Sequence, residues 1–572
     1  MLSQKIKKWI FSHVGSLTKT EEDLLCEINQ HFEETSNIEL PKKLFEKIHS
    51  VEKRRLLGIT YTPKSIREIL TTTVLNKLEE NKDLSKVRIS DPCCGSGLFS
   101  ITIIDELIKR GLHLENIIQN NIYLSDIDKL SVSISMINLY QYSKRNNVDI
   151  SSYKINCQVI DYLESDEKFD AFITNPPYVK LQNLNLNLRE SLKKKYPNLF
   201  VGALGLSAIF LRKMLDDLNK NGILGVITQN NLFTSTSAKI LRKEITSHLY
   251  RIDNFGSEKI FDDVIAYTCL IYLTKDVQEN FEYKKIVKLE NLKQKPSVIS
   301  NKVLNYEKWR LGTKKELDDL LVLEREGIPL KNACKIWVGV ATQFDKAFVV
   351  TKINSEWIGT SKSKKNFIIE NDIVKKFIRV SDLTNNQSVE ENCKGIIYPY
   401  KIISSNRVES IKEDELKEKY PNAYKFLLTW KEELMERDKA SVSKNDWYKW
   451  GRIQSMIPTK NKLLTKTFNK GPCFYFDKSD SLFSNGYAIT VAMNTYHLDF
   501  VKEVLNSKTF EYYAKLTSFE IEGAYQCYQK NFIERFCLPI ISMKEQLSLL
   551  QNGNIDNYLK DYFKLNFNFM ND

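Results

Sequence analysis

The sequence has few of the patterns that mark membrane, metal or disulfide-bonded proteins. No window approaches the ~18 to 20 uninterrupted apolar residues that a membrane span needs. Residues 1–11 contain lysines but no adequate apolar segment for a signal peptide. Ten cysteines occur without a C-x-x-C pair or a cysteine–histidine cluster, so neither zinc nor a disulfide framework is indicated. We therefore expect a protein without a metal that resides in the reducing cytoplasm and has no membrane partner.

Two common phosphate-binding motifs are also missing, because neither G-x-G-x-x-G nor a Gly-Lys-Ser/Thr loop occurs. Repeats and low-complexity tracts are absent, and 572 residues are too many for one core. Strands alternate with helices over residues 51–290, which is typical of a parallel sheet. We predict three parts: a helical extension (1–50), a catalytic α/β domain (51–290) and a mixed α+β domain (300–572).

The most informative segment is Asn175-Pro176-Pro177-Tyr178, in a chain with only 13 prolines. It follows the apolar run 169–174, which predicts a buried parallel strand, so the turn lies where open α/β sheets bind ligands. Two prolines make the turn stiff and leave its carbonyl groups as acceptors. Asn175 adds a side-chain oxygen and Tyr178 an aromatic face. Such a site suits a planar ring that carries an amino group.

A second turn follows the predicted strand 87–90 and precedes a predicted helix from Leu98 to Arg110. It reads Asp91-Pro92-Cys93-Cys94-Gly95-Ser96-Gly97. Gly95 and Gly97 allow backbone to approach a ligand closely. The carboxylate of Asp91 would repel a pyrophosphate, so this turn favours a ligand with a cationic or amine end.

Two further acids stand at the ends of predicted strands. Asp126 follows strand 122–124, where a carboxylate commonly accepts both hydroxyl hydrogens of a ribose. Asp161 follows strand 157–160 and could accept from an adenine amino group. Each acid alone is more often a helix N-cap. Their succession before the Asn-Pro-Pro-Tyr turn favours a nucleoside-binding site.

These motifs, in this order, resemble the gamma-class (TaqI-like) adenine N6 DNA methyltransferases of restriction–modification systems. The resemblance of the motifs covers residues 55–275 and implies a Rossmann-like methyltransferase domain, S-adenosylmethionine as the cofactor and double-stranded DNA as the partner. The C-terminal part, 300–572, resembles the DNA target-recognition domain of the same family. The resemblance assigns the methionine end of the cofactor to the segment 58–63, which contains Thr62, and to the loop containing Asp91, Cys93, Gly95 and Gly97. It assigns the ribose to Asp126, the cofactor adenine to Asp161, and catalysis to Asn175, Pro176, Pro177 and Tyr178. Phe261 loosely matches an aromatic that stacks on the extruded base.

The net charge of +12 is modest, but its distribution is uneven. From residue 301 onward there are 42 Lys and Arg against 35 Asp and Glu. Between Lys444 and Lys478, eight basic and two acidic residues alternate with seven aromatics. This pattern suits phosphate contacts and base stacking, although the aromatics could equally form a buried cluster. The predicted DNA contacts are Lys449, Arg452, Lys460, Lys462 and Lys466.

Two other segments carry expectations of their own. Residues 179–205 lack clean periodicity, which predicts a mobile loop over the site. Residues 413–439 predict a long helix within the β-rich region.

Alternative functions remain. A cytosine C5 methyltransferase would need a nucleophilic cysteine in its active loop, whereas Cys93 lies in the cofactor loop. Protein glutamine and RNA amino-group methyltransferases use the same Asn-Pro-Pro-Tyr chemistry. A DNA-binding subunit with an inactive methyltransferase fold is a third alternative. The sequence carries no convincing nuclease motif, and a separate cognate endonuclease is a possible partner.

Overall fold

The computed structural model describes residues 2–35, 44, 47–48, 62–200, 202, 204–261, 267–286, 295–405, 407–437, 446–521 and 523–567. The chain divides into two compact units, Met1–Lys314 and Lys315–Asp572. Within the described ranges no helix is long and apolar enough to cross a membrane. Each unit is described separately below.

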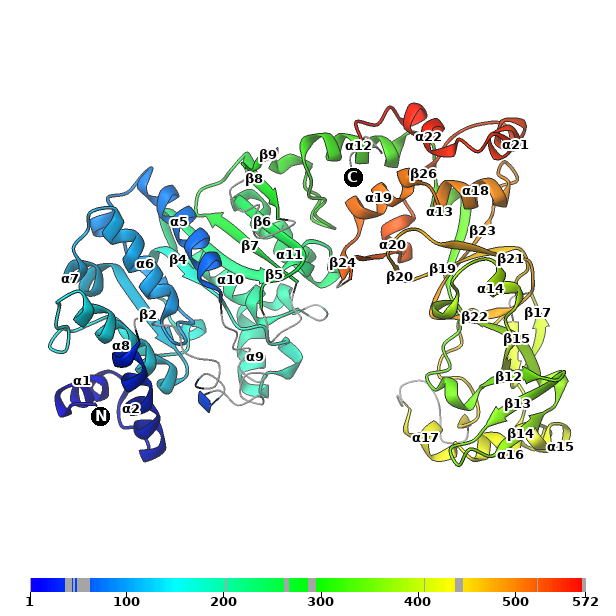
Figure 1. Ribbon diagram of the computed structural model, residues 1–572, viewed down its shortest axis with the longest axis horizontal. Helices are drawn as coiled ribbons and strands as arrows, with labels where there is room; N and C mark the ends of the chain where they lie inside the picture. The colour runs from blue at the N-terminus through cyan, green and yellow to red at the C-terminus, as the bar shows by residue number, and fades with distance from the viewer. Residues whose placement is uncertain are drawn as a thin grey trace. The chain divides into compact units, whose positions relative to one another are not determined.

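Unit 1 contains a nine-stranded sheet in the order β3-β2-β1-β4-β5-β7-β6-β8-β9 (Figure 1). Neighbours from β3 to β5 are parallel, whereas β7 is antiparallel to both β5 and β6. The strands are β1 (Ile89–Asp91), β2 (Ile122–Asp126), β3 (Cys157–Val159), β4 (Phe169–Thr174), β5 (Leu218–Gln229), β6 (Leu249–Lys259), β7 (Tyr267–Thr274), β8 (Asn280–Lys285) and β9 (Ser297–Ser300). Strand order reverses between β1 and β4, and such a point is where open α/β sheets bind ligands.

Helices α5, α6 and α8 contact one another in turn, and α10 packs against α11. The helices of unit 1 are α1 (Gln4–Val14), α2 (Lys19–Glu34), α5 (Lys64–Glu79), α6 (Leu98–Lys109), α7 (Leu114–Asn116), α8 (Lys129–Arg145), α9 (Leu186–Lys195), α10 (Leu206–Asp217) and α11 (Lys239–Ile245). The α/β fold class predicted from the sequence is confirmed.

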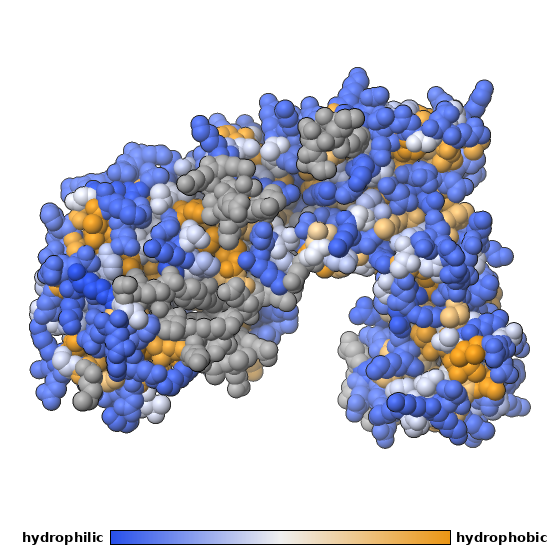
Figure 2. All heavy atoms as spheres, viewed as in Figure 1, coloured by the Kyte–Doolittle hydropathy of each residue, from blue (hydrophilic) through white to orange (hydrophobic). Residues whose placement is uncertain are grey.

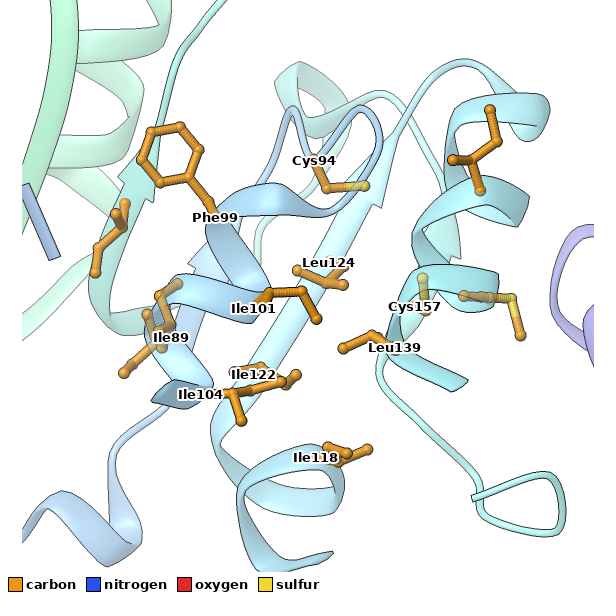
Figure 3. Close-up of a cluster of buried hydrophobic side chains, with 14 of the residues drawn as sticks. Ile89, Cys94, Phe99, Ile101, Ile104, Ile118, Ile122, Leu124, Leu139 and Cys157 are labelled. Carbon is orange, nitrogen blue, oxygen red and sulfur yellow. The ribbon is translucent and has the colours of Figure 1, made fainter. Parts of the chain in front are cut away.

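The core beneath the first three strands holds the turn after β1 in place. Figure 3 shows isoleucines of α6 facing Ile89 of β1 and Ile122 of β2. Cys94, in the turn itself, belongs to the same buried cluster. Its Sγ lies 3.5 Å from the hydroxyl oxygen of Ser135 on α8. The turn is therefore fixed by apolar packing as well as by backbone hydrogen bonds.

The N-terminal helices α1 and α2 share the core of the nine-stranded sheet. Trp9 is buried in that core and its indole N–H donates to the carbonyl of Tyr153 at 2.9 Å. On α2, Asn29 accepts a hydrogen bond from Gln141 of α8 at 2.6 Å. Figure 1 shows α1 and α2 beside α8. Residues 2–35 thus pack as a layer of unit 1.

Unit 2 combines several small sheets with short helices. A four-stranded sheet has the order β11-β23-β19-β21, and a six-stranded sheet has the order β14-β13-β12-β16-β15-β22. Two pairs, β10-β26 and β17-β18, and the sheet β20-β25-β24 complete the strands. The mixed α+β character predicted for this half is confirmed.

The strands of unit 2 are β10 (Ile328–Pro329), β11 (Cys334–Val338), β12 (Val349–Ile353), β13 (Glu356–Thr360), β14 (Asn366–Ile369), β15 (Val374–Arg379), β16 (Lys394–Ile397), β17 (Tyr400–Ser404), β18 (Arg407–Ser410), β19 (Lys462–Lys466), β20 (Phe468–Asn469), β21 (Phe474–Asp477), β22 (Leu482–Ser484), β23 (Gly486–Val491), β24 (Glu520–Ile521), β25 (Tyr525–Cys527) and β26 (Cys537–Leu538). Its helices are α12 (Lys314–Arg325, beginning at the unit boundary), α13 (Leu330–Ala333), α14 (Gln387–Glu390), α15 (Glu413–Lys419), α16 (Pro421–Leu428), α17 (Lys431–Glu436), α18 (Leu498–Leu505), α19 (Lys508–Thr517), α20 (Lys530–Ile533), α21 (Met543–Asn552) and α22 (Ile555–Phe563).

Two expectations about local structure are wrong. Residues 179–205 contain helix α9, capped by Asn185, whose side chain accepts from the Leu188 N–H at 2.8 Å. The two ends of this segment lie together, because the amide of Leu206 donates to the carbonyl of Val179 at 2.7 Å. Within 413–437, the described part of the predicted helix 413–439, the chain forms three short helices, because Pro421 begins a new helix and cannot continue the previous one.

Candidate functional site

The turn after β1 presents a buried carboxylate. Asp91 is 1% exposed, and its Oδ1 accepts from the Thr174 hydroxyl at 2.7 Å and from the amide of Cys93 at 3.3 Å. Its Oδ2 is buried without a hydrogen-bond partner in the described part of the chain. Burial raises the pKa of Asp91 to about 7. A buried carboxylate oxygen without a partner favours a ligand that brings a donor or a positive charge.

The glycines of this turn are needed for its shape. Gly97 has φ +80°, and a Cβ there would lie 2.9 Å from the hydroxyl oxygen of Ser135. Gly95 has φ +52°, and a Cβ there would meet nothing within 4 Å. The carbonyl of Gly95 accepts from the Ser135 hydroxyl at 2.8 Å. The turn is thus pressed against α8 at Gly97 and open at Gly95.

Asp126 at the end of β2 is joined to the same turn. Its Oδ2 accepts from the amide of Gly95 at 3.0 Å and its Oδ1 from the amide of Asp128 at 2.9 Å. Burial raises the pKa of Asp126 to about 6. This acid therefore fixes the turn after β1, in addition to the ribose contact predicted for it.

Asp161 caps a short 3-10 turn at residues 162–164, accepting from the amide of Leu163 at 2.9 Å. Its predicted contact with the cofactor adenine stays a prediction.

The half-buried residue Cys93 lies near Asp91, Asp126 and Asp161. Its pKa is raised by burial first and then by the charges of Asp126, Asp91 and Asp161. The three predicted cofactor acids thus gather around one point of the sheet edge.

The Asn-Pro-Pro-Tyr turn leaves β4, whose six residues are all buried. The side-chain amide of Asn175 donates to the Thr62 hydroxyl at 3.2 Å. The Thr62 carbonyl accepts from the Arg67 guanidinium at 2.5 Å, which anchors Thr62 to α5. The structure thus brings Thr62 to the Asn-Pro-Pro-Tyr turn. Residues 58–61 of the same predicted segment lie outside the described residues.

Tyr178 is half-buried, and its hydroxyl has no hydrogen-bond partner among the described residues. Burial raises its pKa well above the usual range, so the phenol stays protonated. Its ring meets Phe261 edge to face, with centroids 6.3 Å apart. Phe261 is 3% exposed. The structure therefore places Phe261, which only loosely matches the family pattern, against the Asn-Pro-Pro-Tyr turn.

A cavity of about 130 Å³ opens beside Tyr178. Its wall includes Ser207 of α10, and Thr228, Gln229 and Asn231 at the carboxyl end of β5. None of these polar residues was predicted from the sequence. A signal existed, because Gln229-Asn230-Asn231 comes one residue after the apolar run 222–227, within the region whose alternating strands and helices predict a parallel sheet.

The basic segment of unit 2 differs from the prediction. Lys462 is fully buried and pairs with Asp477 at 2.7 Å, so it cannot contact phosphate. Lys449 is half-buried and pairs with Asp446, and its predicted DNA contact stays a prediction. Arg452 and Lys460 are exposed and Lys466 is half-buried, so these three stay candidate DNA contacts. Five of the seven aromatics of the segment are core residues: Trp447, Tyr448, Trp450, Phe474 and Tyr475.

The fold and the gathered motifs are similar to those of S-adenosylmethionine-dependent methyltransferases of restriction–modification systems. The family model described as Eco57I restriction-modification methylase matches residues 120–261, about a quarter of the chain. The chain is 24% identical over 413 residues to the type II restriction enzyme and methyltransferase RM.Eco57I of Escherichia coli, covering 66% of this chain and 41% of that protein. It is 22% identical over 536 residues to the type II methyltransferase M.BstVI of Geobacillus stearothermophilus, covering 85% and 90%.

A solved structure of the type IIL restriction-modification enzyme MmeI in complex with DNA shares the fold. The TM-score is 0.61 at 16% identity, over 89% of this chain and 72% of that one. These matches confirm the resemblance to restriction–modification methyltransferases and the expectation of S-adenosylmethionine as cofactor. The chain spans less than half the length of the Escherichia coli enzyme.

Proposed function

We propose that this protein is a site-specific DNA adenine N6-methyltransferase that acts on a flipped-out base in double-stranded DNA. The observation that carries the proposal is the Asn175–Tyr178 turn. It lies at the carboxyl end of β4, beside Thr62, Phe261 and a cavity. Two acceptors and an aromatic face in one rigid turn suit a planar amino-bearing ring.

The neighbouring turns fit the cofactor. S-adenosylmethionine would supply an activated methyl group. The buried oxygen of Asp91 suits its positively charged amine, and the open space at Gly95 leaves room beside the backbone. Asp126 would accept from the ribose hydroxyls and Asp161 from the adenine amino group. Cys93 lies among these acids with a protonated thiol, which suits packing and not nucleophilic attack.

The catalytic role of the turn follows from the amino nitrogen of adenine. Its lone pair is delocalised into the ring, so the nitrogen is a poor nucleophile. The side-chain oxygen of Asn175 and the carbonyl of Pro176 would accept its two hydrogens and localise the lone pair on nitrogen. Fixed acceptors of this kind contribute about 3 kcal/mol each. Pro177 keeps the turn stiff, and Tyr178 would stack on the flipped base.

The proposal extends to the biological setting. The chain would be the modification enzyme of a restriction–modification system, acting in the cytoplasm. A cognate endonuclease would then be a separate protein that cuts unmethylated sites.

A glutamine side chain of a protein also presents a planar NH2 group, and so does a base in RNA. The test is methyl transfer from labelled S-adenosylmethionine, offered in parallel to duplex DNA, RNA and a glutamine-containing protein substrate. We expect label in DNA and its recovery as N6-methyladenine. Label in the protein or RNA substrate alone would replace the proposal with the corresponding alternative.

A further inference from the structure

Ile453 in unit 2 is unusually exposed for a large apolar residue. It is 84% exposed, more than any other large hydrophobic side chain in the described ranges. Its neighbours Trp450 and Met456 are buried at 1% and 4%. The chain therefore leaves the core after Trp450, places Ile453 in solvent and returns to the core at Met456.

The turn that carries Ile453 is anchored on both sides. Before it, the amides of Gly451 and Arg452 donate to the carbonyls of Thr342 and Ala341 at 3.0 and 3.1 Å. After it, the Gln454 amide group donates to the Gly339 carbonyl at 2.8 Å. The hydroxyl of Ser455 donates to the Val338 carbonyl at 2.5 Å. Ile453 cannot turn inward without breaking these bonds, so the fold holds it outward.

The surrounding sequence favours a polyanion as the partner. No acidic residue occurs from 447 to 476, whereas six basic residues do. Arg452 is adjacent to Ile453 and exposed, and Lys460 and Lys470 are also exposed. Figure 2 shows that hydrophilic residues cover most of the visible face, with hydrophobic residues in separate groups. A fixed, exposed apolar side chain next to the exposed Arg452, in a segment without acidic residues, suits a nucleic acid, which carries phosphates on the outside and apolar base faces inside.

We propose that Ile453 is a wedge that enters the base stack of duplex DNA while Arg452 contacts a phosphate. The inference rests on the proposed function and adds a residue to it. Apolar side chains inserted between base steps unstack them and bend the duplex. Unstacking also lowers the cost of extruding a base, which the proposed chemistry requires.

The first test compares Ile453→Ser with Ile540→Ser, a control change at a second isoleucine of unit 2 that is 65% exposed. DNA affinity is measured on the duplex that wild type methylates. We expect Ile453→Ser to bind at least tenfold more weakly and Ile540→Ser to bind within twofold of wild type. Ile453→Met should recover most of the affinity, because it restores an apolar side chain. Thermal unfolding should be the same for all, since both isoleucines are exposed.

The second test separates a wedge from an ordinary surface contact. Affinities are measured on duplexes that each carry one abasic position, scanned across the site. A wedge contributes little to affinity at an abasic position, because no base has to be unstacked there. At one position the difference between wild type and Ile453→Ser should therefore fall below threefold. A loss that is equal on every duplex, or no loss at all, would overturn the wedge. Failure of wild type to bind any duplex would instead overturn the proposed function.

Discussion

At the scale of single residues, the site depends on oxygen atoms whose positions are fixed by neighbouring strands. Thr174 and Asn175 are adjacent in the chain, yet the first holds Asp91 and the second contacts Thr62. The end of β4 therefore links the turn proposed to bind the cofactor with the turn proposed to bind the target base. Small changes at these residues should separate binding from chemistry.

We predict that Asn175→Ala lowers the methyl-transfer rate by about 10²- to 10³-fold, the typical loss for one preorganised hydrogen-bonding group. S-adenosylmethionine affinity should stay within threefold of wild type. Asn175→Asp is the matched variant, because it keeps an acceptor oxygen and loses the donor to Thr62. It should retain more activity than Asn175→Ala. Single-turnover transfer of a tritiated methyl group measures both, and alanine activity within threefold of wild type would remove the acceptor role.

The predicted role of Asp126 gives cofactor binding a pH dependence. Its pKa of about 6 means that roughly nine in ten molecules are protonated at pH 5 and cannot accept both ribose hydrogens. Protonation of Asp126 should therefore contribute about a tenfold fall in affinity for S-adenosylmethionine between pH 7 and pH 5, in addition to the fall from Asp91, whose pKa is about 7. Calorimetry at both values measures this. The variant Asp126→Asn should bind S-adenosylmethionine more weakly at pH 7 and should lose the tenfold contribution of Asp126 to the pH dependence. If the variant keeps the full pH dependence of wild type, the ribose contact lies elsewhere.

The same shifts affect the stability of the cofactor-free protein. The folded pKa values of Asp91 and Asp126 lie above the usual value of 3.8. A raised folded pKa favours folding below the unfolded pKa, and this contribution is lost as the pH rises through about 6 to 7. The amine of the cofactor would offset the loss at Asp91.

At the scale of elements, the Lys462–Asp477 pair joins β19 to β21 inside unit 2. Asp477 also accepts from the amide and the hydroxyl of Ser479, at 2.8 and 2.7 Å. Lys462→Met should lower the free energy of unfolding by about 3 to 5 kcal/mol, because it leaves a buried carboxylate without its cation. Lys460→Ala, on the exposed neighbour, should change it by less than about 0.5 kcal/mol.

Urea unfolding followed by tryptophan fluorescence compares these two variants. The double variant Lys462→Met/Asp477→Leu should recover part of the loss, since the buried charge is then gone. Equal stability of Lys462→Met and wild type would mean that the pair contributes nothing net.

Much of unit 1 was predictable because its signals are local. The apolar run 169–174 and the turns that follow β1, β2 and β4 were all predicted. Parallel topology places such strand ends at one edge, which brings Asp91, Asp126 and Asn175 together. Helix α9 was missed because three of its ten residues are consecutive lysines and only Leu192 is buried.

The errors in unit 2 have a different physical origin. The burial of Lys462 depends on Asp477, fifteen residues away on another strand, and no local pattern reports such a pairing. The aromatic residues of the same segment are interleaved with lysines, yet packing in the hydrophobic cores of unit 2 buries most of them. The position of Ile453 could not be derived from the sequence, because it depends on anchors more than a hundred residues away.

At the scale of the whole molecule, the chain divides into units of 314 and 258 residues. We propose that the first carries out the chemistry and the second contacts DNA. Replacing Arg452, Lys460 and Lys466 together by alanine should weaken binding to all DNA sequences. The slope of log affinity against log salt should decrease by about three, one for each lost phosphate contact. The rate at saturating DNA should change little.

The charge-matched control replaces Lys362, Lys364 and Lys365, three exposed lysines of the same unit outside the basic segment. It should leave the slope within about one of wild type. If both triple variants behave alike, the basic segment is an ordinary solvated surface.

The central claim is that the Asn175 turn methylates adenine in DNA. The most direct measurement is sequencing, with detection of modified bases, of genomic DNA from cells that express the wild-type chain or the Asn175→Ala variant. We predict N6-methyladenine at one recurring sequence in the wild-type sample and none at that sequence in the variant sample. An expressed, folded wild-type protein that binds S-adenosylmethionine but leaves no modified adenine would contradict the account.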